Sequence, residues 1–336
     1  MASSEGGSGA GSGGRDDGEG GGAYPKNLEG LLKFSIENTA ANPDDKPQYE
    51  PMSEERAKWL QEALKGLYRD DVKEMKKCLE ILTEKRESEE EDDIASRENA
   101  LDYLEELCES MDNARDFHKI GGIPTIKQCL DDANSGVRWR AAELIATMAQ
   151  NNPYCQNVFI DDGFLKVLLT GTDKDSVDMV RVKSLYAVSC IVRTNAKAQE
   201  EFVKDDGFSV VIRAMQSNIE KLQIKAAFMV NAMITDNATL KDTLYKMGFV
   251  QQLVGLLETP HNASHEHILS ILSNLVTNHS GCLEECKLPA VKLEDILRRK
   301  IDQIKGKEEY QEELEFAQQI LKSCFSNQGN GQAMDR

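Results

Sequence analysis

The sequence predicts an all-α fold: an armadillo-like α-α superhelix, a solenoid of about four three-helix repeats with helical caps at both ends. Three long apolar segments align with one another and begin at Gly136, Met179 and Lys221. Glycines recur between the segments at intervals of 41, 44 and 41 residues, at Gly122, Gly163, Gly207 and Gly248. An interval near 42 is the armadillo or HEAT length, and alternating strand patterns are nearly absent.

The composition is that of an acidic soluble protein. The 336 residues hold 40 Lys and Arg against 58 Asp and Glu, a formal net charge of −18, and a nucleic-acid binder usually has the opposite sign. No apolar run approaches the roughly 18 residues of a membrane span, and the first residues do not form a secretory signal. We therefore expect neither nucleic acid nor membrane as a partner. We expect a cytoplasmic or nuclear location and a monomer.

Eight cysteines are scattered along the chain, and most fall at apolar positions of helical patterns. They are Cys78, Cys108, Cys129, Cys155, Cys190, Cys282, Cys286 and Cys324. Buried, reduced thiols fit this distribution better than disulfides do.

The first fifty residues divide into two predicted segments. Residues 1–25 are rich in Gly and Ser and are predicted to be disordered, because they cannot bury enough apolar surface. Residues 26–50 hold a short apolar element and then a linker marked by Pro43 and Pro47. The apolar residues of that element are Leu28, Leu31, Leu32, Phe34 and Ile36.

Residues 51–93 are predicted to form an N-terminal helical cap and an acidic loop. Ser53 is a good N-cap for a first helix. Helical spacing of apolar residues predicts a second helix through Val72, Met75, Leu79 and Leu82. The acidic run 87–93 follows, and we interpret it as a solvated loop, with a docking patch for a basic partner as the alternative.

Residues 94–289 are predicted to hold the repeats. We prefer three helices per unit over two-helix HEAT units because residues 151–169 divide at Gly163, where a steep turn needs left-handed backbone dihedrals. A fourth long helix begins at His265. Residues 290–326 depart from the repeat and are predicted to be the C-terminal cap, and residues 327–336 a loose tail.

The sequence shows no enzyme motif: nucleophile elbow, P-loop, HExxH and paired CxxC are all missing, so we predict no catalytic residue and no cofactor. The one arguable zinc cluster comprises His261, His265, His267, Cys282 and Cys286. Helical spacing turns His265 and His267 about 200° apart. We therefore predict surface histidines, core thiols and no metal site.

The third helix of each unit is predicted to line a concave surface. Stacking the three aligned segments superposes Arg140, Lys183 and Lys225, and three residues later Glu143, Tyr186 and Phe228. The basic row is either a set of solvated side chains or a complement to an acidic partner. Tyr154, Tyr186 and Trp139 look isolated and are predicted to belong to the core.

Several long motifs resemble those of one family. They are PMSEERAKWLQEAL, MDNARDF, WRAAELIATMAQNN, VRVKSLYAVSCIVR, GFSVVIRAM and EEYQEELEFAQQILKSCF. From about Asn27 onward the chain resembles the armadillo-type nucleotide exchange factors that bind the 70-kDa heat-shock chaperone. The resemblance implies that the concave face grips one lobe of the chaperone's nucleotide-binding domain and so releases ADP, with no bond made or broken. Asn113, Ala114 and Lys225 match the family's gripping positions.

The resemblance also suggests roles beyond the grip. The apolar element of residues 26–50 looks like the family's N-terminal release element, which would occupy the chaperone's peptide groove; a helix packed on the first cap is the alternative. Family members also restrain chaperone-associated ubiquitin ligases. An adaptor for extended peptides is the competing function, although the Trp and Asn ladder of such adaptors is missing. The fourth long helix has no basic residue at the equivalent position, so the resemblance does not predict which residues contact the chaperone at the C-terminal end.

Overall fold

The computed structural model describes residues 70–84 and 91–326, together with Glu54, Ala57 and Lys58. The chain divides at residue 70, and the helices discussed below belong to the second, compact unit, which begins at Asp70. The predicted first helix of the N-terminal cap, like the release element and both tails, falls outside the described residues apart from those three positions.

The second unit is all helical in its described residues, as predicted. Its α-helices are α3 (Asp71–Thr83), α4 (Glu91–Cys108), α5 (Met111–Lys119), α6 (Ile123–Cys129), α7 (Ser135–Ala149), α8 (Pro153–Asp161), α9 (Phe164–Lys174), α10 (Asp178–Val192), α11 (Ala196–Lys204), α12 (Gly207–Met215), α13 (Glu220–Asp236), α14 (Leu240–Lys246), α15 (Phe249–Leu257), α16 (Ser264–Val276), α17 (Ser280–Lys287), α18 (Leu293–Ile304) and α19 (Gln311–Phe325), with a short 3₁₀ helix η1 (Glu308–Tyr310) before α19. No helix among the described ranges is long and apolar enough to cross a bilayer.

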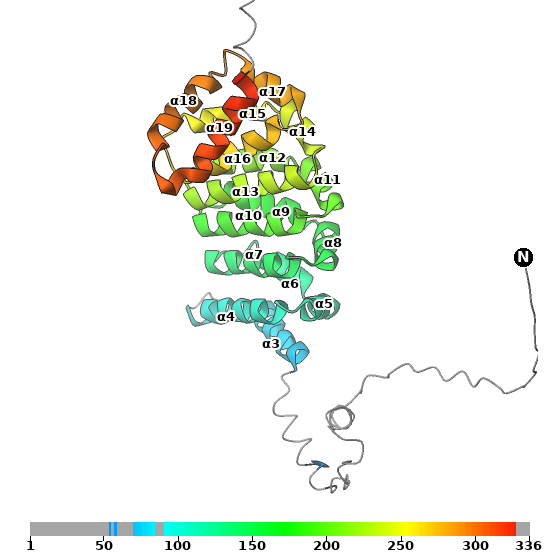
Figure 1. The fold of residues 1–336 in the computed structure, drawn as a ribbon. Coiled ribbons are helices and arrows are strands. Elements are labelled where there is room, and N and C mark those ends of the chain that lie inside the picture. Colours follow the sequence, from blue (N-terminus) through cyan, green and yellow to red (C-terminus); the bar gives the residue numbers. More distant parts are fainter. Residues whose placement is uncertain (1–53, 55–56, 59–69, 85–90, 327–336) are drawn as a thin grey trace, which may run out of the picture. The chain divides into compact units, whose positions relative to one another are not determined.

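Three-helix units repeat four times, as α5–α7, α8–α10, α11–α13 and α14–α16. The last helix of each unit is long, and these helices pack on one another in the order α7, α10, α13 and α16, with the long helix α4 packed against α7 before them. Figure 1 shows them as parallel rungs, with the short first helices along one edge. We call the surface formed by these five long helices the third-helix face.

Side-chain caps and buried polar groups hold the helices of the stack together. Asn152 and Asn195 accept hydrogen bonds from the first turns of α8 and α11, at 3.3 and 3.1 Å. One turn after Asn152, the buried Gln156 donates to the carbonyl of Ala149 in the preceding unit at 3.2 Å and to that of Cys190 in its own unit at 2.9 Å. At the equivalent place the buried Lys241 donates to the carbonyls of Asn274 and Thr277. These bonds satisfy carbonyl groups at the ends of the long helices.

The four spaced glycines serve two different purposes. Gly163 adopts left-handed dihedrals as predicted, with φ of 69°, and Gly248 does the same with φ of 65°. At the other two turns the left-handed residue is the preceding one, Gly121 or Asp206. Gly122 and Gly207 are required for space instead: a Cβ there would lie 2.3 Å from the ring of Phe117 or Phe202.

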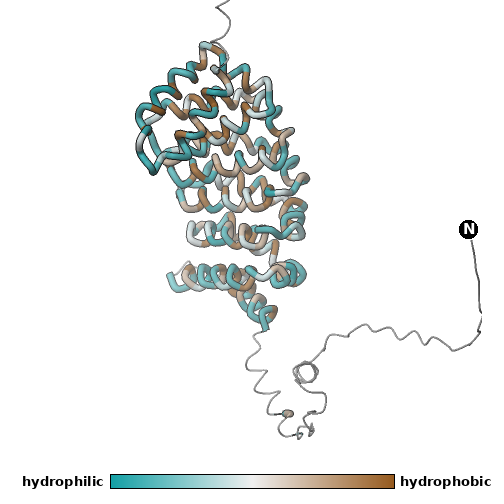
Figure 2. Tube along the Cα trace, in the orientation of Figure 1, coloured by the Kyte–Doolittle hydropathy of each residue, from teal (hydrophilic) through white to brown (hydrophobic). Residues whose placement is uncertain are grey.

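The core runs along the whole stack as a continuous apolar layer between the helices (Figure 2). All eight cysteines are free and buried within it, as predicted. Burial raises the pKa of Cys129 to about 12 and that of Cys155 to about 11, which keeps both as protonated thiols.

The two ends of the described unit differ from the expected caps in detail. α3 forms where predicted, but the acidic run does not end as a loop: Glu91, Asp92 and Asp93 form the first turn of α4. Acidic side chains are favourable there because they face the positive end of the helix dipole. At the other end, α17, α18 and α19 follow in order, and α19 packs directly on α16.

Candidate partner-binding face

The basic row and the row three residues later both lie on the third-helix face, where the structure places them in contact across neighbouring units. Each cation of the row reaches back to the preceding long helix. The partner that it meets changes from unit to unit, and with it the chemistry that the surface offers.

Between α4 and α7 the row is an ion-pair network. Arg140 lies 3.0 Å from a carboxylate oxygen of Glu98 and 2.8 Å from one of Asp102. Its guanidinium also lies over the Trp139 ring, 4.2 Å from the centroid. Beside it, Thr147 donates a hydrogen bond to Glu105 at 3.1 Å. The cation is therefore neutralised by the protein's own carboxylates.

Between α7 and α10 the contact is a partly buried pair. Lys183 forms an ion pair with Glu143. Burial is the main cause that lowers the pKa of Lys183, and the positive charges of Lys225 and Lys221 lower it further, against the opposing effect of Glu105. The charge of Lys183 is therefore also largely compensated within the protein.

Between α10 and α13 the cations meet aromatic rings instead of carboxylates. Lys225 Nζ lies 4.5 Å from the centroid of Tyr186, and the guanidinium of Arg193 lies 5.9 Å from that of Phe228. Phe228 is 55% exposed. Among the described residues, neither cation pairs with a carboxylate. We call Tyr186, Arg193, Lys225 and Phe228 the α10–α13 cluster.

A pocket of about 220 Å³ opens at the α10–α13 cluster. It is lined by Leu185, Tyr186, Ser189, Arg193, Ile224, Lys225 and Phe228. The Tyr186 hydroxyl lies 3.4 Å from Gln150, which fixes the ring from the far side. Rigid aromatic and cationic groups around an apolar hollow are what protein partners use as binding hot spots.

The row ends at α16. Ile268, 43 residues after Lys225, occupies the next place and is buried, as is Ile271. α19 packs on α16 and lies in front of it in Figure 1. Between α13 and α16 the amide of Asn274 donates to Asn231 at 3.0 Å. The third-helix face is therefore closed at this end, which explains why no basic residue follows Lys225.

The two predicted gripping residues on α5 lie apart from the third-helix face. Asn113 donates to Asp71 and to the carbonyl of Leu107, both at 2.8 Å, and so ties α5 to α3 and α4. Ala114 is 0% exposed. Its methyl group is part of the core and presents no surface to a partner in this structure.

Two sequence-level predictions about exposure are wrong. Tyr154, Tyr186 and Trp139 are not core residues, since each retains exposed surface and receives a cation at its ring. His265 is not a surface histidine: it is 0% exposed, and burial, followed by the charge of Lys300, lowers its pKa to about 4.

Arg193 is the member of the cluster that was not identified when the three aligned segments of the sequence were stacked. It follows Tyr186 by seven residues, which is two helical turns, and therefore lies on the same face of α10. The exposed Met179 precedes Tyr186 by the same interval. Extending the row along each helix, rather than only across units, would have found both.

Two family models match the sequence. One is described as the nucleotide exchange factor Fes1 and matches residues 28–117. The other is described as the SIL1/FES1/HPBP1 C-terminal domain and matches residues 113–247. Together they cover the predicted release element and the helices that carry the basic row.

Relatives and solved structures agree with this match. Hsp70-binding protein 1 of Mus musculus is 43% identical over 321 residues, which cover 93% of this chain and 89% of that protein. The human protein of the same name is 42% identical with the same coverage. Hsp70 nucleotide exchange factor FES1 of Saccharomyces cerevisiae is 26% identical over 262 residues, which cover 75% of this chain and 87% of that protein.

A designed armadillo repeat protein superposes with a TM-score of 0.59 at 17% identity and covers 74% of this chain and 98% of its own. This likeness supports the armadillo fold alone. Since the sequence relatives match over nearly their whole length, the chain belongs to the SIL1/FES1/HPBP1 family, together with Fes1 and Hsp70-binding protein 1.

Proposed function

We propose that this chain is a co-chaperone that binds the nucleotide-binding domain of the 70-kDa heat-shock chaperone and promotes the release of ADP. Its relatives carry the names Hsp70-binding protein 1 and Hsp70 nucleotide exchange factor. The binding site is inferred from the α10–α13 cluster, where the exposed Phe228 ring and two cations that pair with no carboxylate among the described residues lie beside a pocket.

Exchange of this kind is binding rather than catalysis. A protein that binds the open, nucleotide-poor chaperone more tightly than the closed one must lower the affinity for ADP by the same factor. A difference of about 1 to 3 kcal/mol between the two states accounts for an effect of about 5- to 150-fold. No residue of this chain needs to touch the nucleotide.

Charge supports an acidic patch as the target of the cluster. The chain carries a net charge of −18, so an acidic partner is repelled by most of its surface. Lys225, Arg193 and the exposed Lys221 offer the opposite sign at one place. This favours the partner-complement interpretation of the basic row at α10 and α13. At α7, where Arg140 is already paired, it favours the structural one.

The rate of release of fluorescent ADP from a 70-kDa heat-shock chaperone, measured by stopped flow, tests the proposal. We expect the wild-type chain to accelerate release. Lys225→Glu and Phe228→Ala should each need a much higher concentration for the same rate. Lys246→Glu is the matched control, because it makes the same charge change at an exposed position on α14, away from the third-helix face.

Each outcome has a clear meaning. No acceleration by saturating wild-type chain would contradict the exchange function. Acceleration that both cluster variants retain would keep the function but remove the binding site from the α10–α13 cluster. Ala114→Arg is unsuitable for this test, because Ala114 is buried and the variant would report on folding.

For the segment that contains Leu28, Leu31, Leu32, Phe34 and Ile36 we propose the release of client polypeptide. The match to the Fes1 model begins at residue 28, so this segment lies within the family's own region. Deleting residues 1–50 should leave ADP release intact and weaken client release. Loss of both activities would reject the division of labour.

The peptide-adaptor alternative receives no support from the third-helix face. An adaptor needs asparagine amides free to bind peptide backbone, but the amides of Asn231 and Asn274 bond to Ser270, Thr235 and each other. A role at a chaperone-associated ubiquitin ligase, a cytoplasmic location and a monomeric state stay predictions from the sequence.

A further inference from the structure

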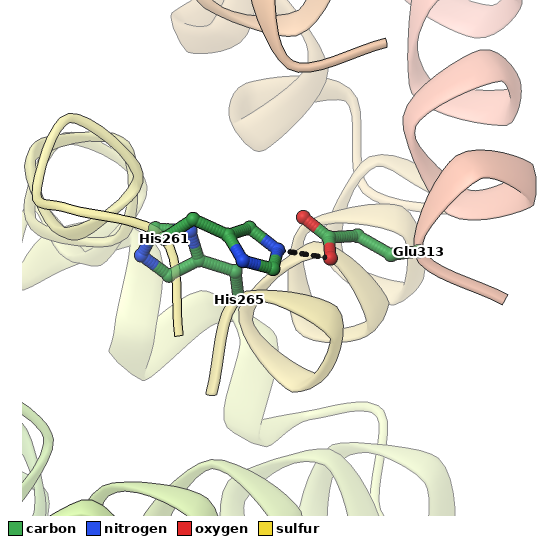
Figure 3. Close-up of side chains that lie close together, drawn as sticks. All are labelled: His261, His265 and Glu313. Carbon is green, nitrogen blue, oxygen red and sulfur yellow. Dashed lines mark hydrogen bonds and ion pairs between the residues drawn. The ribbon is translucent and has the colours of Figure 1, made fainter. Parts of the chain in front are cut away.

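Three side chains from three separate elements converge at the C-terminal end of the stack. His261 lies in the connection between α15 and α16, His265 in the first turn of α16, and Glu313 in the first turn of α19. One ligand atom from each lies within 4.8 Å of the others (Figure 3). His261 Nε2 is 2.8 Å from Glu313 Oε2, and the two imidazole rings lie edge to face with centroids 5.4 Å apart.

The carboxylate of this cluster lacks part of its expected environment. Glu313 is 2% exposed, and its Oε1 is buried with no hydrogen-bond partner among the described residues. A buried carboxylate oxygen without a donor is costly, and a bound cation is one of the standard ways to satisfy it. This oxygen is an observation independent of the grouping of the ligands.

Contacts with surrounding residues hold both imidazole rings of the cluster in place. Thr259 Oγ1 lies 3.2 Å from His265 Nε2 and itself donates to the carbonyl of Leu256 at 2.7 Å. His261 packs edge to face against Tyr310, with centroids 4.8 Å apart. Such partners orient metal-binding imidazoles in known sites.

Solvent can reach the cluster from one side. A pocket of about 400 Å³ is lined by Thr259, Pro260, His261, Ile296, Arg299 and Lys300, among others. The side chain of His261 is partly exposed, whereas His265 and Glu313 lie behind it. An ion could enter through this pocket, and a water molecule could occupy a fourth coordination position.

We propose that His261, His265 and Glu313 form a binding site for a divalent transition-metal ion of the zinc type. Two imidazoles and one carboxylate with a position left for water are a common zinc ligand set. The sequence-level prediction of no metal site considered His267 and the cysteines as partners. The fold supplies a different third ligand, Glu313, which is 52 residues from His261.

The proposed ion would fix α19 to α16. Its ligands join the α15–α16 connection, α16 and α19, and α19 is the helix that covers Ile268 and closes the third-helix face. Binding would therefore add to the stability of the C-terminal end by mass action. The site is far in sequence from the α10–α13 cluster, and its test does not depend on chaperone binding.

Lys300 is the built-in competitor for the ion. It is buried, and its Nζ lies 2.5 Å from His265 Nδ1. As an ammonium group it would repel a divalent ion at this distance. The competing interpretation is that Lys300 is the permanent cation of the cluster and that no metal binds. The two interpretations predict opposite behaviour for Lys300→Met.

Zinc binding to the full chain, after treatment with a chelator, is the decisive measurement. We expect one Zn²⁺ per chain by competition with a chromophoric chelator, and the visible absorption of tetrahedral Co²⁺ when that ion is added alone. His261→Asn and Glu313→Gln should weaken binding beyond the about 10- to 100-fold cost of losing an outer hydrogen-bond partner. His267→Asn is the matched control on α16 and should bind as the wild type does.

Lys300→Met should bind Zn²⁺ at least about tenfold more tightly, because a like charge is removed. Hydrogen exchange should show that zinc protects the amides of α19 and leaves those of α7 unchanged. A wild-type chain without stoichiometric binding would overturn the proposal. So would binding that His261→Asn leaves unchanged, since the ion would then sit on other groups such as the thiols.

Discussion

The basic row of the third-helix face has one geometry and two kinds of environment. At α4–α7, Arg140 is enclosed by Glu98 and Asp102. At α10–α13, Lys225 occupies the equivalent position and meets the ring of Tyr186, while Phe228 stays exposed. Both cations come from the same place in the repeat. The difference teaches that the preceding helix, rather than the repeat position, decides whether a cation stabilises the fold or is available to a partner.

The physical cause is the composition of the helix below each cation. α4 carries Glu98, Asp102 and Glu105 toward α7, so the charge of Arg140 is neutralised internally. A ring attracts a cation more weakly than a carboxylate does and leaves its net charge in place. A partner therefore finds uncompensated positive charge at α10–α13 and little at α4–α7.

The largest expected effect comes from breaking the α10–α13 side. The double variant Lys225→Glu, Phe228→Ala should weaken chaperone binding by about 3 kcal/mol, which is more than 100-fold, as for a hot-spot pair. The free energy of unfolding should change little, because both side chains are exposed. Calorimetric titration of the chaperone's nucleotide-binding domain and urea unfolding measure the two quantities. A large loss of stability would place the cluster in the fold rather than at the partner.

The reverse pattern is expected on the α4–α7 side. Arg140→Ala leaves the carboxylates of Glu98 and Asp102 facing each other without their cation and should lower the free energy of unfolding by about 1 to 2 kcal/mol. Chaperone affinity should stay within about threefold of wild type, since Arg140 lies outside the α10–α13 cluster and residues at the edge of an interface contribute little to affinity. Urea unfolding beside Lys246→Ala as control checks the first part. If Arg140→Ala weakened binding as strongly as Lys225→Glu, the comparison would fail.

Sequence patterns were sufficient for the repeats and for the basic row, because both depend on periodicity. A helix buried on most sides must be apolar with a regular spacing, and stacked units then superpose equivalent positions. Orientation toward a neighbour is not encoded in this way. Ala114 matched a family motif but is packed in the core beside α5's other buried residue, Phe117. The spacing of these two apolar residues indicates the inward face of the helix, which a motif match alone does not consider.

Packing contacts between helices account for the remaining differences. Gly122 and Gly207 are explained by the phenylalanine ring of the preceding helix. Glu313 reaches His261 only because α19 folds back on α16. The pairing of Arg140 with α4 rather than with a partner depends on how adjacent long helices are rotated. The last two contacts have no fixed sequence spacing that a pattern could detect, whereas Phe117–Gly122 and Phe202–Gly207 share a spacing of five residues.

The salt dependence of association should differ between variants of the α10–α13 side and the α4–α7 side, with a smaller effect than the substitutions above have on affinity and stability. Charges at α10–α13 are exposed and screened by salt, so raising the ionic strength from about 0.05 to 0.5 M should slow association with the chaperone. Lys225→Gln should flatten this dependence, and Arg140→Gln should leave its slope unchanged. Association rates by stopped flow at several salt concentrations provide the measurement. Equal slopes for all three proteins would mean that the cluster does not face charge on the partner.

The smallest effect is expected at the boundary between the two sides, where Lys183 pairs with Glu143. Glu143→Gln removes the carboxylate but keeps the shape, so Lys183 becomes an uncompensated cation like Lys225. Because both side chains are mostly buried, loss of the pair should lower the free energy of unfolding by about 1 kcal/mol. Affinity for the chaperone should rise by about 0.5 kcal/mol, roughly twofold, if added positive charge extends the complementary surface. A decrease in affinity would indicate that Glu143 itself contacts the partner, and the boundary of the binding site would then move to α7.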